Sequence, residues 1–61
     1  SMDEDELNGI LDKIIQKNME LVKKLGDNAV TTMMGIAMKE VRGKASGKVV
    51  NDLLRKKISE L

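Results

Sequence analysis

Apolar residues recur at helical spacing in three stretches of the chain. Within the first stretch they fall three or four positions apart, so they would line one face of an amphipathic helix. A glycine follows the last of them and would end the helix. The pattern predicts a first helix over about residues 5–25. Its apolar face consists of Leu7, Ile10, Leu11, Ile14, Ile15, Val22 and Leu25.

A second helix is predicted over about residues 28–42, with Asp27 as its N-cap and Gly43 at its end. Gly35 lies inside it, where glycine costs about 1 kcal/mol relative to alanine. We therefore expect another backbone to pack closely against Gly35; the alternative is that the glycine makes the helix flexible at this point. The apolar face of this helix consists of Val30, Met33, Met34, Ala37, Met38 and Val41.

The third predicted helix covers about residues 47–60 and has Ser46 as its N-cap. Together the three patterns predict an all-α fold, a compact three-helix bundle with short connections. The apolar face of the third helix consists of Val49, Val50, Leu53, Leu54, Ile58 and Leu61.

Methionine takes the place of aromatic residues in this predicted core. Two interpretations are open, because methionine is both a flexible core filler and a common lining of grooves that bind partners. The residues concerned are Met19, Met33, Met34 and Met38.

Composition removes several classes of function. The chain has no Cys, His, Phe, Tyr or Trp. Thiolate metal sites, histidine-based acid–base catalysis and base stacking on aromatic rings are therefore disfavoured. We expect no enzymatic activity and no metal or cofactor site in this chain. The sequential carboxylates of residues 3–6 give no preformed ligand cage.

The domain organisation is simple at this length. We expect residues 1–6 to be a tag remnant and a frayed acidic start, and residues 7–61 to be one helical domain that is a fragment of a larger protein. No apolar run approaches the roughly 18 residues of a membrane span, and no signal peptide is recognisable. A cytoplasmic location without a membrane partner is the expectation.

Charge is distributed unevenly along the chain. Residues 1–31 carry four Lys and seven Asp or Glu, a net charge of −3, whereas residues 32–61 carry seven Lys or Arg and three Asp or Glu, a net charge of +4. The two values sum to the +1 of the whole chain. The asymmetry favours an anionic partner for the second half.

Basic residues gather around the predicted turn between the second and third helices. A helix N-terminus surrounded by cations favours phosphate, and glycines allow a ligand to approach closely. Asn51 is expected to form a hydrogen bond across the turn, or alternatively to reach a ribose. The predicted phosphate-binding residues are Lys39, Arg42, Gly43, Lys44, Gly47, Lys48 and Asn51.

A plainer interpretation of this turn stays open, in which its basic residues are solvated surface charges. The phosphate site requires that Lys44 and Lys48 lie together, in surroundings that Asp and Glu do not neutralise. A second basic run, residues 55–57, is interpreted as a complement to the dipole at a helix C-terminus.

The stretch from Met34 to Leu54 has the form MGxxMKExRGKxxGKxVNxLL. It resembles the C-terminal tail domain, of the GatB/YqeY type, that ends the B-type and E-type subunits of glutamyl-tRNA(Gln) amidotransferase. Tails of the B type often have proline where this chain has Gly47, so the resemblance to the E type is favoured.

The resemblance implies a parent that converts Glu-tRNA(Gln) to Gln-tRNA(Gln) with ATP, Mg²⁺ and ammonia from a glutaminase subunit. It places that chemistry upstream of this chain. It also implies that the tail contacts folded tRNA(Gln) near its elbow, and gives no reason to expect a DNA partner. Folded RNA is read through shape, phosphates and 2′-hydroxyls, which does not require aromatic stacking.

RNA binding has two alternatives. Small helical domains of the ubiquitin-associated type also contain a Met-Gly pair, next to an exposed apolar patch. An exposed surface made of Met33, Met34 and Ile36 would favour such a protein-interaction module. The domain would otherwise be a structural appendage.

Overall fold

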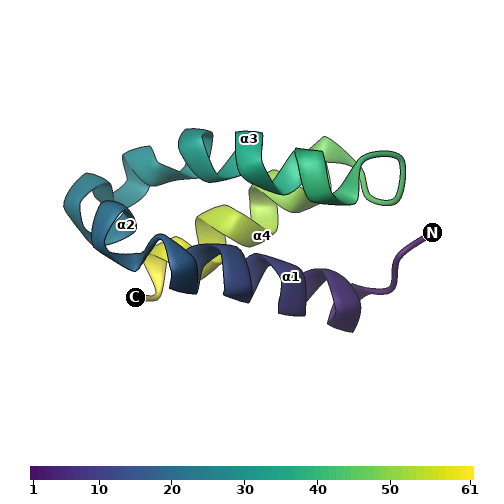
Figure 1. Ribbon diagram of the computed structural model, residues 1–61, viewed down its shortest axis with the longest axis horizontal. Coiled ribbons are helices and arrows are strands. Elements are labelled where there is room, and N and C mark those ends of the chain that lie inside the picture. Colours follow the sequence, from purple (N-terminus) through teal and green to yellow (C-terminus); the bar gives the residue numbers. More distant parts are fainter.

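The computed structural model describes residues 1–61 and consists of helices joined by short connections, with no strand. Three long helices lie alongside one another in an elongated bundle of 32 × 17 × 17 Å (Figure 1). This confirms the all-α, compact three-helix bundle. The helices are α1 (Glu4–Lys17), α2 (Met19–Leu25), α3 (Ala29–Val41) and α4 (Gly47–Ser59), with a 3₁₀ turn at Gly26–Asn28.

A break at Asn18 divides the first predicted helix into α1 and the short α2. In a continuous helix the backbone N–H of Asn18 would bond to the carbonyl of Ile14. It bonds instead to the carbonyl of Ile15 at 3.1 Å, and the Asn18 side-chain Nδ2 donates to the Ile14 carbonyl at 2.7 Å. The side chain thus satisfies the carbonyl that the break leaves free, and α2 becomes the corner that leads into α3 (Figure 1).

The connection between α2 and α3 differs from its prediction. Gly26 ends α2 with a φ of 59°, as expected of a terminating glycine. Asp27, however, is not the N-cap of α3: it lies in the 3₁₀ turn, and no side chain caps α3. Because this turn is already helical, the backbone N–H of Ala29 donates a hydrogen bond to the Gly26 carbonyl. The helix therefore needs no side-chain cap.

Thirteen residues form the buried core, and all of them are apolar. Leu11 from α1, Met33 from α3 and Leu54 from α4 are fully buried at its centre. Met19, Met34 and Met38 pack against the core while partly exposed, so the methionines do fill the core.

Two predicted core positions of the third helix lie on the surface. Val49 is 46% exposed and Leu61 is 63% exposed. At the start of α4 it is Val50, and not the adjacent Val49, that is buried in the core. Leu61 lies beyond the end of α4. The buried positions of α4 are Val50, Leu54 and Ile58.

Gly35 does not have the close neighbour that we expected. It lies exposed in the middle of α3, and a Cβ atom added to it would meet nothing within 4 Å. The cost of about 1 kcal/mol relative to alanine is therefore not offset by packing inside the domain. Gly9 in α1 is likewise exposed and open.

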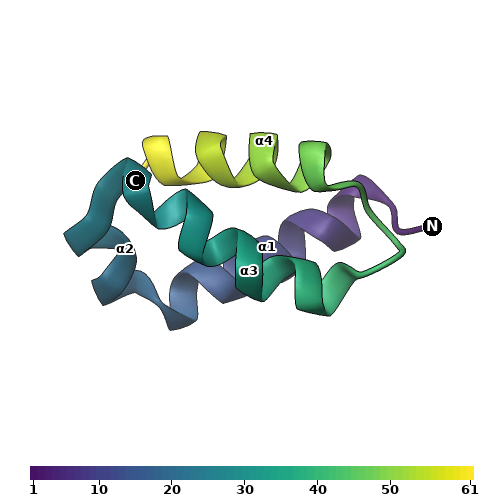
Figure 2. The same cartoon turned by 90° about the horizontal axis from the view of Figure 1, so that it is seen from above.

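The start of the chain contacts the rest of the bundle, and α1 begins at Glu4, within the segment 1–6. The Asp3 carboxylate caps α1 by accepting a hydrogen bond from the Glu6 N–H at 2.8 Å. Met2 packs against the core, and its N–H donates to the Lys44 carbonyl at 3.2 Å. The acidic start of α1 therefore lies at the same end of the bundle as the α3–α4 loop, as both ribbon views show (Figures 1 and 2).

Candidate nucleic-acid interface

The loop that follows α3 is shaped by one glycine. The chain leaves the helix at Arg42, with φ −48° and ψ 127°. Gly43 follows with a φ of 75°, in the left-handed region that residues with a Cβ atom rarely adopt. The Lys44 N–H then donates to the Val41 carbonyl at 2.8 Å and closes the turn. Gly43 therefore has a conformational reason for its place, independent of any ligand.

The start of α4 agrees with its prediction. The Ser46 hydroxyl accepts a hydrogen bond from the Val49 N–H at 3.2 Å, which confirms Ser46 as the N-cap. Gly47 is the first residue of α4, and a Cβ atom there would meet nothing within 4 Å. Unlike Gly43, it has no positive φ.

Three of the predicted cations are exposed and form no ion pair: Lys39 in the last turn of α3, Arg42 after it, and Lys44 in the loop. They follow one another within six residues at one end of the bundle. This part of the predicted site is available to an anion.

Lys48 differs from them because Asp52, one turn later in α4, forms an ion pair with it at 2.8 Å. The hydrogen bond from Lys48 to Asp52 and the negative charge of Asp52 raise the pKa of Lys48 above its usual 10.5. A raised pKa means that the pair contributes fully below pH 10.5 and less as the pH rises above it. Both side chains are largely exposed, so the pair contributes little and a phosphate can compete for Lys48.

Acidic residues also reach this end of the bundle from α1. The contact between Met2 and Lys44 brings the segment Asp3–Glu6, with its four carboxylates, to the side of the loop. Lys48 is thus paired with Asp52, whereas Lys44 forms no ion pair, and the expectation that Asp and Glu leave the surroundings of Lys44 free stays a prediction. Lys39 and Arg42, on the α3 side of the loop, also form no ion pair.

Asn51 makes no hydrogen bond across the turn. It is half-buried in the second turn of α4, and its side chain has no hydrogen-bond partner in the domain. Its amide is therefore open to solvent or to a ligand.

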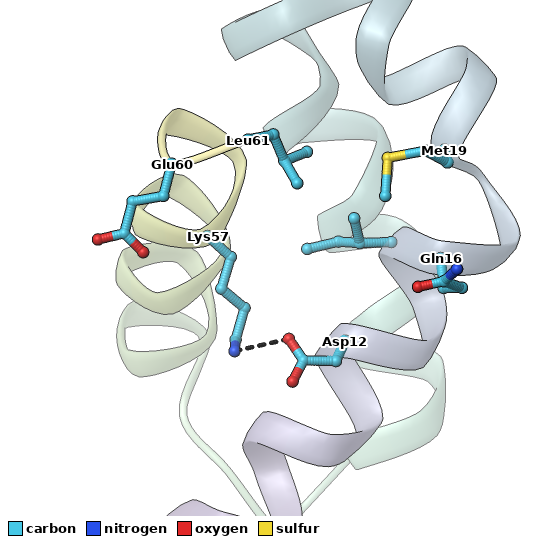
Figure 3. A pocket seen from close by; sticks show the side chains of 7 residues that line it. Asp12, Gln16, Met19, Lys57, Glu60 and Leu61 are labelled. Carbon is cyan, nitrogen blue, oxygen red and sulfur yellow. Dashed lines mark hydrogen bonds and ion pairs between the residues drawn. The ribbon is translucent and has the colours of Figure 1, made fainter.

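A hollow between α1 and α4 (Figure 3) has Met19 of α2 in its lining, and it therefore lies toward the α2 end of the bundle, away from these cations (Figure 1). It has a volume of about 470 Å³ and apolar walls formed by Ile15, Met19 and Leu61. Lys57 crosses it to form an ion pair with Asp12 at 2.8 Å. Lys57 thus joins α4 to α1 and does not merely complement the end of its helix.

The apolar patch that would favour a ubiquitin-associated type of module is not present. Met33 is fully buried, and Met34 and Ile36 are half-buried against the core. The Met-Gly pair lies inside α3 and not in a loop. None of the helices combines the length and the apolar character that crossing a membrane requires.

Comparisons with known proteins assign this chain to a family. A model of the GatB domain (GatB/YqeY) matches residues 1–58. The chain is 43% identical over 60 residues to the E-type subunit of glutamyl-tRNA(Gln) amidotransferase from Thermococcus gammatolerans, covering 98% of this chain and 10% of that protein. The corresponding protein of Thermococcus sibiricus is 46% identical over 59 residues, covering 97% of this chain and 9% of that protein.

A third relative, the E-type subunit from Methanocaldococcus jannaschii, is 42% identical over 60 residues, which is 98% of this chain and 10% of the relative. The chain thus spans about a tenth of the length of these relatives. No solved structure matches it. The family model and the three relatives confirm the resemblance seen in the sequence: the chain belongs to the GatB domain family, in the form found in the E-type subunit of glutamyl-tRNA(Gln) amidotransferase.

Proposed function

We propose that this domain binds folded tRNA and so helps the E-type subunit of a glutamyl-tRNA(Gln) amidotransferase to select tRNA(Gln). The observation that carries the proposal is the similarity over nearly the whole chain to proteins whose names specify that tRNA. The exposed, unpaired cations Lys39, Arg42 and Lys44 support it from the side of the structure.

The mode of recognition follows from the chemistry of the exposed residues. Without aromatic side chains, the domain has no platform on which to stack unpaired bases. Lysine and arginine donate charge-assisted hydrogen bonds to phosphate, and small polar groups reach the 2′-hydroxyls that distinguish RNA from DNA. Recognition would therefore read the shape of folded RNA and not its unpaired bases.

We assign no catalytic step to this domain. Its residues include no group of three or more His, Cys, Asp or Glu that could hold a metal ion. The ATP, the Mg²⁺ and the glutaminase partner that the family resemblance implies would act on other parts of such an amidotransferase.

A titration with folded tRNA tests the proposal. With about three phosphate contacts, the affinity should fall roughly 40-fold between about 50 mM and 200 mM salt, because bound phosphates release their counterions. The double variant Arg42→Gln plus Lys44→Gln removes two unpaired cations and should weaken binding by more than about tenfold at the lower salt concentration.

The double variant Lys23→Gln plus Lys24→Gln is the matched control. It removes the same charge from the exposed surface of α2, at the other end of the bundle (Figure 1). Its affinity for tRNA should stay within about threefold of the unaltered chain, since only long-range attraction is lost. Equal losses in the two double variants would contradict a site at the α3–α4 end.

A further inference from the structure

One surface of α3 is left uncovered by the rest of the bundle. Three-and-four-residue spacing puts Thr31, Thr32, Gly35 and Lys39 on one exposed side of the helix, and Arg42 continues this side into the loop. We call these five residues the α3 outer face. In Figure 2, α3 passes in front of α1, and no other element covers α3 on the side toward the viewer.

Gly35 at the centre of this face has no explanation within the domain. Its φ is not positive, no backbone approaches it, and the space above it is open. Gly43, in contrast, is required by its φ of 75°. The helix thus carries a destabilising residue that allows a group outside the domain to come closer to the helix backbone.

The charges around Gly35 indicate which kind of partner would approach it. The α3 outer face contains two hydroxyl groups without hydrogen-bond partners in the domain and two cations without ion pairs, and no carboxylate. The one acidic residue of α3, Glu40, follows Lys39 by one position, about 100° around the helix. A polyanion with hydrogen-bonding groups complements such a surface.

Gly9 shows that an exposed glycine in a helix is not sufficient for a surface that attracts a polyanion. Its neighbours one turn before are Asp5 and Glu6, and those one turn after are Asp12 and Lys13, a net negative set. Phosphate would be repelled there. Gly9 and Gly35 are therefore alike in their exposure and in the open space around them, but the residues that surround them have opposite net charge.

We infer that the sugar–phosphate backbone of RNA lies across the α3 outer face, with Gly35 as the point of closest approach. Lys39 and Arg42 contact phosphates, and the hydroxyls of Thr31 and Thr32 reach phosphate or 2′-hydroxyl oxygens. This inference rests on the proposed tRNA binding and moves its centre from the α3–α4 loop, which the acidic start of the chain adjoins and where Lys48 is paired with Asp52, to the side of α3.

The pair Gly35→Ala and Gly9→Ala tests the inference with folded tRNA as the probe. Both variants should raise the melting temperature of the domain by about 4–8 °C, because alanine favours the helix at open positions. Gly35→Ala should nevertheless weaken tRNA binding about tenfold, as its methyl group displaces the RNA backbone. Gly9→Ala should bind tRNA within about twofold of the unaltered chain.

The remaining outcomes separate this inference from the proposal on which it rests. If the unaltered chain does not bind tRNA, the proposed function fails and the inference fails with it. If it binds, and Arg42→Gln plus Lys44→Gln weakens binding while Gly35→Ala does not, the inference alone is overturned. Self-association of the chain without RNA in sedimentation equilibrium, abolished by Gly35→Ala, would identify a second copy as the occupant and would also overturn it.

Discussion

At the scale of single residues, the glycines of this domain fall into different physical classes. Gly26 and Gly43 have positive φ values and belong to turns. Gly9 and Gly35 lie in helices, exposed and with open space around them. A sequence shows only that a glycine is present, and the φ value and the surrounding space decide what it does.

Replacing the two glycines of the α3–α4 connection should therefore have opposite effects. Gly43→Ala should lower the free energy of unfolding by about 1–2 kcal/mol, because alanine is strained at a φ of 75°. Gly47→Ala should leave it unchanged or raise it slightly, since alanine fits the first turn of α4 without a clash. Urea unfolding followed by circular dichroism measures both. A similar loss in both variants would show that the positive φ of Gly43 is not what makes alanine unfavourable there.

At the scale of elements, helix ends and breaks were less predictable than helix faces. The three apolar faces follow from spacing alone, and most of their residues are buried. The break at Asn18 escaped prediction because it depends on a side chain that bonds back to the Ile14 carbonyl. Asp27 was wrongly expected to cap α3 because a 3₁₀ turn supplies backbone partners instead.

The candidate site was predictable only in part, for a related reason. Sequence places Lys39, Arg42 and Lys44 close together, and they are indeed exposed at one end of the bundle. Whether Lys48 keeps a free charge depends on the rotamer that brings it to Asp52. The surroundings of Lys44 depend on how the start of the chain folds back, and helical periodicity carries no information about that.

Asn18→Ala tests the account of the break between α1 and α2. Without the Nδ2 donor, the partly buried Ile14 carbonyl loses its 2.7 Å hydrogen bond, and the domain should lose about 1 kcal/mol of stability. Asn28→Ala is the control, because the Asn28 side chain is exposed and makes no capping bond. Thermal unfolding measures both variants, and an unchanged or raised melting temperature for Asn18→Ala would contradict this role.

At the scale of the whole molecule, folding rearranges the charge asymmetry of the sequence. The acidic first half and the basic second half do not form two separate poles, because Met2 and Lys44 join the chain start to the α3–α4 loop. Carboxylates of Asp3–Glu6 then border the loop, while α3 keeps a side with cations and hydroxyls alone. We therefore expect an anionic partner to bind at the side of α3, away from α1.

The most direct test of the account maps where folded tRNA contacts the domain. In ¹H–¹⁵N NMR spectra of the labelled domain titrated with tRNA, the largest shift changes should fall on the α3 outer face, strongest at Gly35 and Lys39, and continue into residues 42–44. The backbone amides of Ile15, Met19 and Leu61, at the hollow between α1 and α4, should keep their positions. Changes centred on that hollow or on residues 3–6, with the α3 outer face unaffected, would contradict the account.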